Sequence, residues 1–298
     1  MTAPAPLRVL LFPGQGAQAT GMGAELFDRY PALVAEADDV LGWPVAEVCR
    51  DNPGNILLRT EYAQPALYVV EALSLLAYRD DGGPEPDRVA GHSLGEYPAL
   101  FAAGVFDFAT GLRLVQRRGR VMARGPSGSM AALLGLDLEQ VRQLLDRLEL
   151  TELDIALRNA PGQVAVAGPA DALDRLVEAA FDEGIRCVRL NVSGPFHSRY
   201  MRRAADRFSR FLPLFDLAPP SLPVIANVTA RPHEPGRIPD ALVDQIQRTV
   251  LWEDTVGLLL DEAEAAGREA EFVELGPGRT LTGMVDRIRR ARPPALSA

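Results

Sequence analysis

The sequence predicts an α/β protein in which a large domain is built on a parallel sheet and a smaller unit is inserted into it. Short apolar strands alternate with amphipathic helices over much of the chain, and this alternation favours a parallel sheet. Between residues 129 and 191 the order is instead strand, helix, strand, strand, helix, strand, which is typical of a ferredoxin-like unit. The 298 residues, of which 47% are hydrophobic, are enough to bury a substantial core.

The elements of the large domain are expected on both sides of this insertion. Helical patterns cover residues 25–41, 66–78, 96–103, 109–124 and 198–212, and a last helix begins near Leu281. Apolar strands are expected at residues 8–12 and 223–228, and a proline-rich loop at 229–239. We therefore assign residues 1–127 and 194–298 to the large subdomain and residues 128–193 to the small one.

Charge and composition exclude several classes of protein. The formal net charge of −9 argues against a nucleic-acid-binding protein, because such proteins carry an excess of cations. No stretch approaches the roughly 20 apolar residues that cross a bilayer, and the short N-terminal apolar run, which ends at Pro13, predicts a strand and not a signal peptide. Cys49 and Cys187 have no metal-ligand or redox spacing, so we expect a cytoplasmic protein without a metal.

Ser93 is the candidate nucleophile. It lies in Gly-His-Ser-Leu-Gly at residues 91–95, after the apolar pair Val89-Ala90 and before a helical pattern, and this is the context of a nucleophile elbow. Glycines flank the serine because the sharp turn leaves little room for side chains, and the helix behind it offers amide hydrogens to an oxyanion. The large subdomain is accordingly expected to be α/β-hydrolase-like.

A serine nucleophile needs a base, and the chain has three histidines. His92 adjoins the nucleophile on the turn and should point elsewhere, while His233 lies in the proline-rich loop. His197, between a predicted strand and a predicted helix, is the better candidate. No acidic residue stands out as the group that orients it, which leaves a backbone carbonyl open for that role.

One arginine is expected to face the protein interior. On a helical wheel of residues 109–124, Arg118 falls among apolar residues such as Leu114 and Val121. A buried guanidinium needs an anion, and its planar fork suits a carboxylate. Two interpretations stay open: a structural ion pair with an internal acid, or a receptor for the free carboxylate of a malonyl-type substrate.

These motifs together resemble one family, the malonyl-CoA:acyl-carrier-protein transacylases and the acyltransferases of polyketide synthases. The resemblance covers essentially the whole chain through FPGQGAQ (12–18), QPAL (64–67), GHSLGEY (91–97), RRG (117–119), NAPGQV (159–164), GPFHS (194–198), NVTARP (227–232) and ELGPGRTLTGM (274–284). With FHSRYM and NVTARP in a free-standing chain, it is most similar to the discrete acyltransferases that serve polyketide modules lacking their own.

The resemblance implies the catalytic residues. Ser93 would be acylated and His197 would be the base. The backbone amides of Gln15 and Leu94 would form the oxyanion hole. By the same matching, the carbonyl of Leu251 would orient the histidine.

The resemblance also implies the substrate and its contacts. A malonyl-type extender would pass from malonyl-CoA to the phosphopantetheine thiol of an acyl carrier protein by a ping-pong mechanism, without a cofactor. Arg118 would bind the carboxylate of the extender, and Phe196 would narrow the pocket against branched extenders. Gln64 and Asn159, in two of the shared motifs, are expected at the substrate.

Two arginine groups are candidates for docking an acidic carrier protein. The first is a stripe on the outer side of the helix at 109–124, made of Arg113, Arg117, Arg120 and Arg124. The second is a cluster near the C-terminus, made of Arg287, Arg289, Arg290 and Arg292. Ionic attraction favours docking there, and a merely solvated face is the alternative interpretation of both groups.

Other functions fit the sequence less well. Residues 14–19 satisfy the loose dinucleotide fingerprint Gly-x-Gly-x-x-Gly/Ala, but no second strand ending in an acidic residue follows. A non-enzymatic carrier-binding protein would not need both a nucleophile and a base. An acyl hydrolase, or a transacylase for an unusual acyl chain, is the nearer alternative, but a neutral acyl group would leave the charge of Arg118 unpaired.

Overall fold

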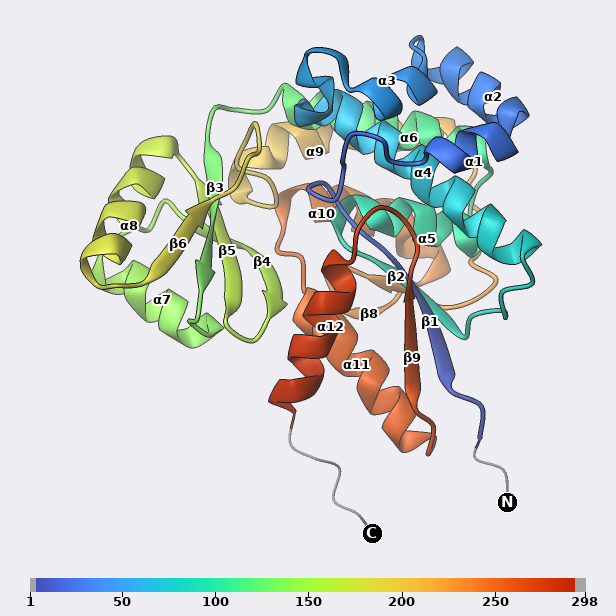
Figure 1. Cartoon of the computed structure of the whole chain (residues 1–298). Coiled ribbons are helices and arrows are strands. Elements are labelled where there is room, and N and C mark those ends of the chain that lie inside the picture. Colours follow the sequence, from blue (N-terminus) through green and yellow to red (C-terminus); the bar gives the residue numbers. More distant parts are fainter. Residues whose placement is uncertain (1–3, 293–298) are drawn as a thin grey trace.

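Two separate sheets organise the chain, and the computed structural model describes residues 4–292 of it (Figure 1). The larger sheet has the order β8-β7-β2-β1-β9. Its strands are β1 (Leu7–Phe12), β2 (Arg88–Gly91), β7 (Val224–Ala226), β8 (Arg231–Pro232) and β9 (Ala270–Glu274). All of them are parallel except β8, which pairs antiparallel with β7 at the edge. The predicted α/β fold with a parallel sheet is confirmed.

The centre of this sheet positions the site. Phe12, the last residue of β1, pairs with Gly91, the last residue of β2. The loops that follow the two strands, one with Gln15 and one with Ser93, therefore leave the sheet at the same edge. Ligands of parallel α/β sheets bind outside the carboxyl ends of the strands.

Helices surround the larger sheet. Before the insertion these are α1 (Ala24–Arg29), α2 (Pro31–Leu41), α3 (Val45–Asp51), α4 (Thr60–Asp80), α5 (Glu96–Ala102) and α6 (Phe108–Ala123). After it follow α9 (Arg202–Ser209), α10 (Ile238–Gln247), α11 (Trp252–Ala265) and α12 (Thr280–Ala291). Helix α5 lies against β1, β2 and β7, α11 and α12 lie against β9, and α4 packs along α6.

Several predicted helices differ from the observed ones. The helix expected at 25–41 is two helices, because Pro31 lacks a backbone N–H and begins α2. Helix α4 starts six residues earlier than expected, at Thr60, and accommodates Pro65 inside its first turns. The pattern at 198–212 contains a short 3-10 turn, Arg199–Met201, before α9.

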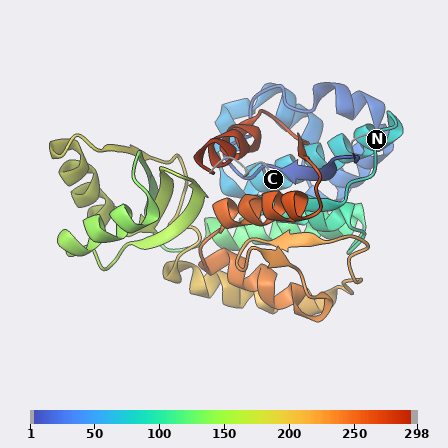
Figure 2. The ribbon, with the colours of Figure 1, turned by 90° about the horizontal axis from the view of Figure 1, so that it is seen from below.

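The smaller sheet has the order β4-β5-β3-β6 and is antiparallel. Its elements are β3 (Ser129–Leu134), α7 (Leu138–Arg147), β4 (Asp154–Ala160), β5 (Gln163–Gly168), α8 (Ala170–Asp182) and β6 (Arg186–Arg189). This is the predicted strand and helix order. The small unit has a core of its own and lies to one side of the large one (Figure 2).

The limits of the two subdomains, 127/128 and 193/194, stay a prediction. The prediction assigns residues 1–3 and 293–298 to the large subdomain, and these lie outside the described residues.

Hydrogen bonds to backbone carbonyls join the small sheet to the large unit. The amide of Arg158 in β4 donates to the carbonyl of Val250, and the amide of Val250 donates to the carbonyl of Ala156, both at 2.9 Å. The hydroxyl of Thr249 donates to the carbonyl of Ile155 at 2.6 Å. These bonds hold the end of β4, which carries Asn159, beside the segment that leads into α11.

Candidate active site

Ser93 stands on a sharp turn between β2 and α5. Its φ of 53° lies in the left-handed region, which is strained for a residue with a side chain. A Cβ on Gly91 would lie 1.9 Å from the backbone of Gly95, and a Cβ on Gly95 would lie 2.0 Å from the carbonyl oxygen of Phe12. Both glycines are therefore required by close backbone approach.

Two amide side chains hold the backbone of this turn. The amide of Ser93 donates to Oδ1 of Asn227 at 2.6 Å, and Nδ2 of Asn227 donates to the carbonyl of Gly91 at 2.7 Å. Nε2 of Gln245 donates to the carbonyl of Ser93 at 2.7 Å. These bonds satisfy buried backbone groups and fix the direction of the serine side chain.

His197 meets the serine. Its Nε2 lies 2.7 Å from Oγ of Ser93, and its Nδ1 lies 2.7 Å from the backbone carbonyl of Gln245. The carbonyl of Leu251, implied by the resemblance as the orienting group, is therefore the wrong one. That carbonyl begins α11 and accepts bonds from the amide and hydroxyl of Thr255, both at 2.9 Å.

The electrostatic surroundings keep His197 neutral. Burial, followed by the positive charge of Arg118, lowers the pKa of His197 to about 3. A neutral imidazole has one free lone pair, and the bond from Nδ1–H to the carbonyl of Gln245 places that lone pair on Nε2, toward Ser93.

The two other histidines bind elsewhere. Nε2 of His92 lies 2.8 Å from Oδ1 of Asn159, and its ring packs edge-on against Trp252. Nε2 of His233 lies 2.6 Å from Oε1 of Glu96, and both side chains are buried. Asn159, expected at the substrate, is thus a partner of His92 across the junction of the subdomains.

Arg118 is fully buried, as its place on the helical wheel predicted. It donates to Oε1 of Gln64 at 2.7 Å, to Oε1 of Gln245 at 2.8 Å and to Oγ of Ser93 at 3.1 Å. Its guanidinium lies 5.6 Å from the centre of the Tyr97 ring. No carboxylate among residues 4–292 lies within ion-pair distance of it, and its Nε is buried without a partner there.

The loop after β1 lies against the turn that carries Ser93. A Cβ on Gly14 would lie 2.5 Å from the carbonyl oxygen of His92. The side chain of Gln15 donates to the hydroxyl of Thr60 at 3.2 Å. The backbone amides of Gln15 and Leu94 donate to no backbone carbonyl within the described part of the chain.

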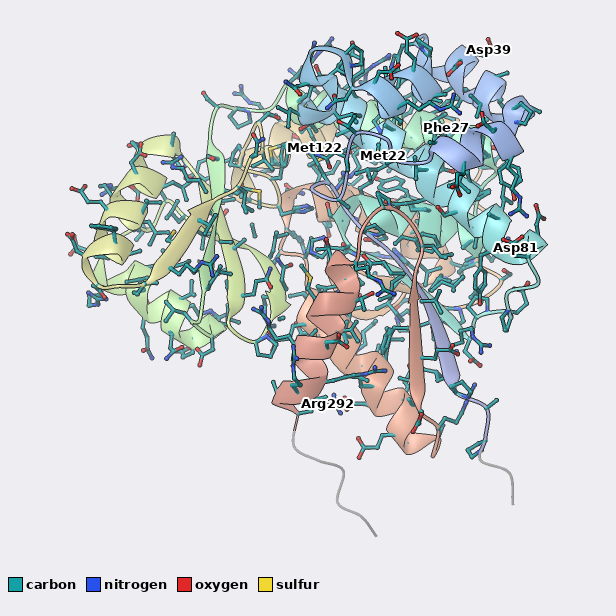
Figure 3. All side chains as sticks on the ribbon, viewed as in Figure 1. Met22, Phe27, Asp39, Asp81, Met122 and Arg292 are labelled. Atoms are coloured by element: carbon teal, nitrogen blue, oxygen red, sulfur yellow. The ribbon has the colours of Figure 1, made fainter. Side chains whose placement is uncertain are left out.

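The remaining predicted substrate residues are buried beside these groups. Besides accepting from Arg118, the Gln64 side chain has its Nε2 at 3.6 Å from Sδ of Met122, which is labelled in Figure 3. Phe196 is buried next to His197, and a Cβ on Gly194 would lie 3.1 Å from its ring.

Three further residues complete the site. Glu96, Asn227 and Gln245 are buried polar residues, and Oε2 of Glu96 accepts a bond of 2.6 Å from Nε2 of Gln245. Glu96 and Asn227 belong to motifs noted in the sequence. Gln245 was not predicted from the sequence. The signal that could have found it is its place on the apolar side of α10, a polar residue between the buried Leu242 and Ile246.

The fold and this site are those of an acyltransferase. The chain belongs to the acyl transferase domain family, whose model matches residues 9–290. It is 47% identical, over 94% of its length and 96% of the relative's, to a polyketide biosynthesis malonyl CoA-acyl carrier protein transacylase of Bacillus velezensis. The crystal structure of a malonyl CoA-acyl carrier protein transacylase from Burkholderia pseudomallei superimposes with a TM-score of 0.95 at 46% identity, covering 97% of this chain and 100% of that one.

A third similar structure is a complex. It contains a type II polyketide synthase acyl-carrier protein with its malonyl-transacylase, and it matches with a TM-score of 0.88 at 34% identity, covering 95% of this chain and 93% of that one. None of the helices in residues 4–292 is long and apolar enough to span a membrane.

Proposed function

We propose that this chain transfers a malonyl group from coenzyme A to the phosphopantetheine thiol of an acyl carrier protein, through an ester on Ser93. The observation that carries the proposal is the pairing of two features. Ser93 Oγ lies 2.7 Å from a neutral histidine and 3.1 Å from a buried guanidinium that has no carboxylate partner in the described chain. A malonyl thioester has both groups this site needs, a carbonyl for the serine and a carboxylate for the arginine.

The first half-reaction acylates the serine. Nε2 of His197 takes the proton of Ser93 as Oγ forms a bond to the thioester carbonyl carbon, and the carbonyl oxygen becomes an oxyanion. The amides of Gln15 and Leu94 would donate to that oxyanion. The C–S bond then breaks, and the coenzyme A sulfur leaves with the proton held by His197.

The second half-reaction reverses the roles. The carrier thiol gives its proton to Nε2 of His197 as its sulfur attacks the ester carbonyl carbon. The C–O bond to Ser93 breaks, Oγ takes the proton back, and the malonyl thioester of the carrier leaves. The carbonyl of Gln245 holds the imidazole in one tautomer through both steps.

Binding of the malonyl carboxylate would also strengthen the base. The charge of Arg118 is one cause of the low pKa of His197. A carboxylate beside the guanidinium offsets that charge, so the pKa of the imidazole rises when the right substrate is bound. Gln64 and Gln245 accept hydrogen bonds from the guanidinium and hold it in place. Phe196, which is buried next to His197, would limit the width of the acyl pocket.

The biological setting follows the relatives. The similarity to a transacylase of polyketide biosynthesis supports a role in that process. Cys49 and Cys187 are free, which supports a cytoplasmic location.

Initial-rate kinetics test the proposal. Varying malonyl-CoA at several carrier concentrations should give parallel double-reciprocal lines, because the two substrates react with different forms of the enzyme. Acetyl-CoA should be a poor donor in the same assay, since it lacks the carboxylate. Intersecting lines would contradict the ping-pong mechanism. Equal use of both donors would contradict the role of Arg118.

A further inference from the structure

The arginines of this protein divide into two groups by their partners. Fifteen of the 31 form an ion pair with a carboxylate. Of the sixteen without such a pair among residues 4–292, eight lie on the outer sides of α6 and α9 or at their C-terminal caps. They are Arg113, Arg117, Arg120, Arg124, Arg202, Arg203, Arg207 and Arg210, here called the α6–α9 arginine surface.

Helices α6 and α9 pack against each other (Figure 1), so the two groups of arginines lie on neighbouring helices. The guanidinium of Arg117 lies 5.5 Å from the centre of the Phe211 ring, just beyond α9. Arg124 from the first helix and Arg203 and Arg207 from the second line one hollow of about 470 Å³. The arginines predicted as a stripe on α6 are thus half of a larger basic surface.

This surface is strongly positive on an acidic protein. Residues 108–124 and 202–210 together contain nine arginines and one acid, Asp206, while the whole chain has a net charge of −9. Arg113, Arg120, Arg124, Arg203 and Arg207 are exposed. Like charges held together without counterions repel one another, so a fold that gathers them here favours an anionic partner.

The α6–α9 arginine surface and the reaction centre are built from the same two segments of the sequence. Arg199 and Tyr200, two and three residues after His197, line the same hollow as Arg124. On the inner side of α6, Arg118 contacts Ser93. One helix therefore carries the buried cation of the site on one side and the basic surface on the other.

We propose that the α6–α9 arginine surface docks the acyl carrier protein, through an acidic face of that protein. This inference rests on the proposed function, and it names where the second substrate binds. The size of the surface favours a protein over a nucleotide, because Arg113 to Arg124 alone span roughly 16 Å of helix at about 1.5 Å per residue. Electrostatic complementarity of this kind raises the rate of encounter and fixes orientation.

The second predicted docking group, on α12, is less suited to this role. Arg292, labelled in Figure 3, pairs with Asp261 and Glu264. Arg289 donates to the carbonyl of Ala270. Arg287 and Arg290 are exposed without a carboxylate partner in the described chain, and they supply a matched control.

The test compares two variants of the full chain. One replaces four exposed arginines of the surface with glutamine (R120Q/R124Q/R203Q/R207Q), which removes charge and keeps good helix formers. The control is R287Q/R290Q. For each we would measure the dissociation constant for a labelled phosphopantetheinylated carrier protein, the KM for that carrier, and the rate of Ser93 acylation by malonyl-CoA.

The surface variant should bind the carrier at least tenfold more weakly and show a KM for the carrier at least tenfold higher. Its acylation by malonyl-CoA and its transfer to free pantetheine should match the wild type, and the control should match it throughout. Added salt should weaken carrier binding to the wild type more than to the surface variant. If the quadruple variant is less stable, R120Q/R124Q and R203Q/R207Q carry the same test separately.

Two results would overturn the docking proposal. One is unchanged carrier binding in the surface variant. The other is slower acylation by malonyl-CoA with unchanged carrier binding, which would assign the arginines to the phosphates of coenzyme A. Failure of the wild type itself to be acylated by malonyl-CoA would instead refute the proposed function, while the direct binding measurement would still decide where the carrier docks.

Discussion

Replacement of Arg118 by alanine should remove the preference for a dicarboxylic substrate. The guanidinium makes three hydrogen bonds to neutral groups, at 2.7, 2.8 and 3.1 Å. No carboxylate of residues 4–292 pairs with it, so the substrate would be its counterion. Malonyl transfer should therefore fall steeply in Arg118→Ala, while acetyl transfer should rise relative to it.

The expected size follows from burial. Removing one partner of a buried charge pair costs about 3–5 kcal/mol, because the other charge is left uncompensated. At about 1.4 kcal/mol per factor of ten, kcat/KM for malonyl-CoA should fall between roughly 100-fold and several thousand-fold. Arg118→Lys should recover only part of the loss, because an ammonium group cannot form two parallel bonds.

The assay is acylation of the protein by malonyl-CoA or acetyl-CoA, with no carrier present, so that docking does not affect it. Arg113→Ala, an exposed arginine on the same helix, is the matched control. The Tm of each variant should be measured beside the kinetics, because Arg118→Ala also leaves the oxygens of Gln64 and Gln245 without their donor. Equal loss of both substrates in a folded variant would refute the reasoning and make Arg118 a structural residue.

Three other changes have definite expected results. Burial, followed by Arg118, lowers the pKa of His197 to about 3, so protonation of this histidine favours the unfolded state and the protein loses stability as pH falls below about 6.5. The free energy of unfolding in urea should therefore fall by roughly 2 kcal/mol less for His197→Asn than for the wild type between pH 7 and pH 5. Burial, followed by Glu274, raises the pKa of Glu71, whose oxygens have no partner in the described chain, so the protein loses stability as pH rises above about 4.5. The Tm of Glu71→Gln should match or exceed that of the wild type at pH 7, and the difference should be larger at pH 8 than at pH 5. A lower Tm at every pH would contradict this. Phe196→Ala should increase the share of methylmalonyl-CoA over malonyl-CoA in competitive acylation, and an unchanged share would show that Phe196 does not limit the pocket.

Local patterns predicted much of this structure because they depend on neighbouring residues. The strand–turn–helix around Ser93 is dictated by Gly91 and Gly95, whose missing side chains permit the backbone contacts. The burial of Arg118 could be predicted because the apolar side of one helix specifies it. The break at Pro31 escaped prediction, although proline at the first position of a helix is a local signal.

Sequence patterns could not predict the hydrogen bonds between residues that are far apart in the sequence. The partner of His197 is the carbonyl of Gln245, and any residue type has a backbone carbonyl, so composition carries no signal for it. Matching of motifs chose Leu251 because it precedes a recognisable Trp252, yet that carbonyl is used inside α11. The pairing of Glu96 with His233 joins residues 137 positions apart, which only the fold brings together.

Acylation of Ser93 is the central claim, and mass spectrometry after incubation with malonyl-CoA tests it most directly. The wild type should gain the mass of one malonyl group, and the gain should lie on the peptide that contains residues 91–95. Ser93→Ala should gain none, while the exposed change Arg113→Ala should leave the gain intact. A malonyl group on Ser93→Ala, or on a different peptide of the wild type, would contradict the assignment of the nucleophile and the mechanism built on it.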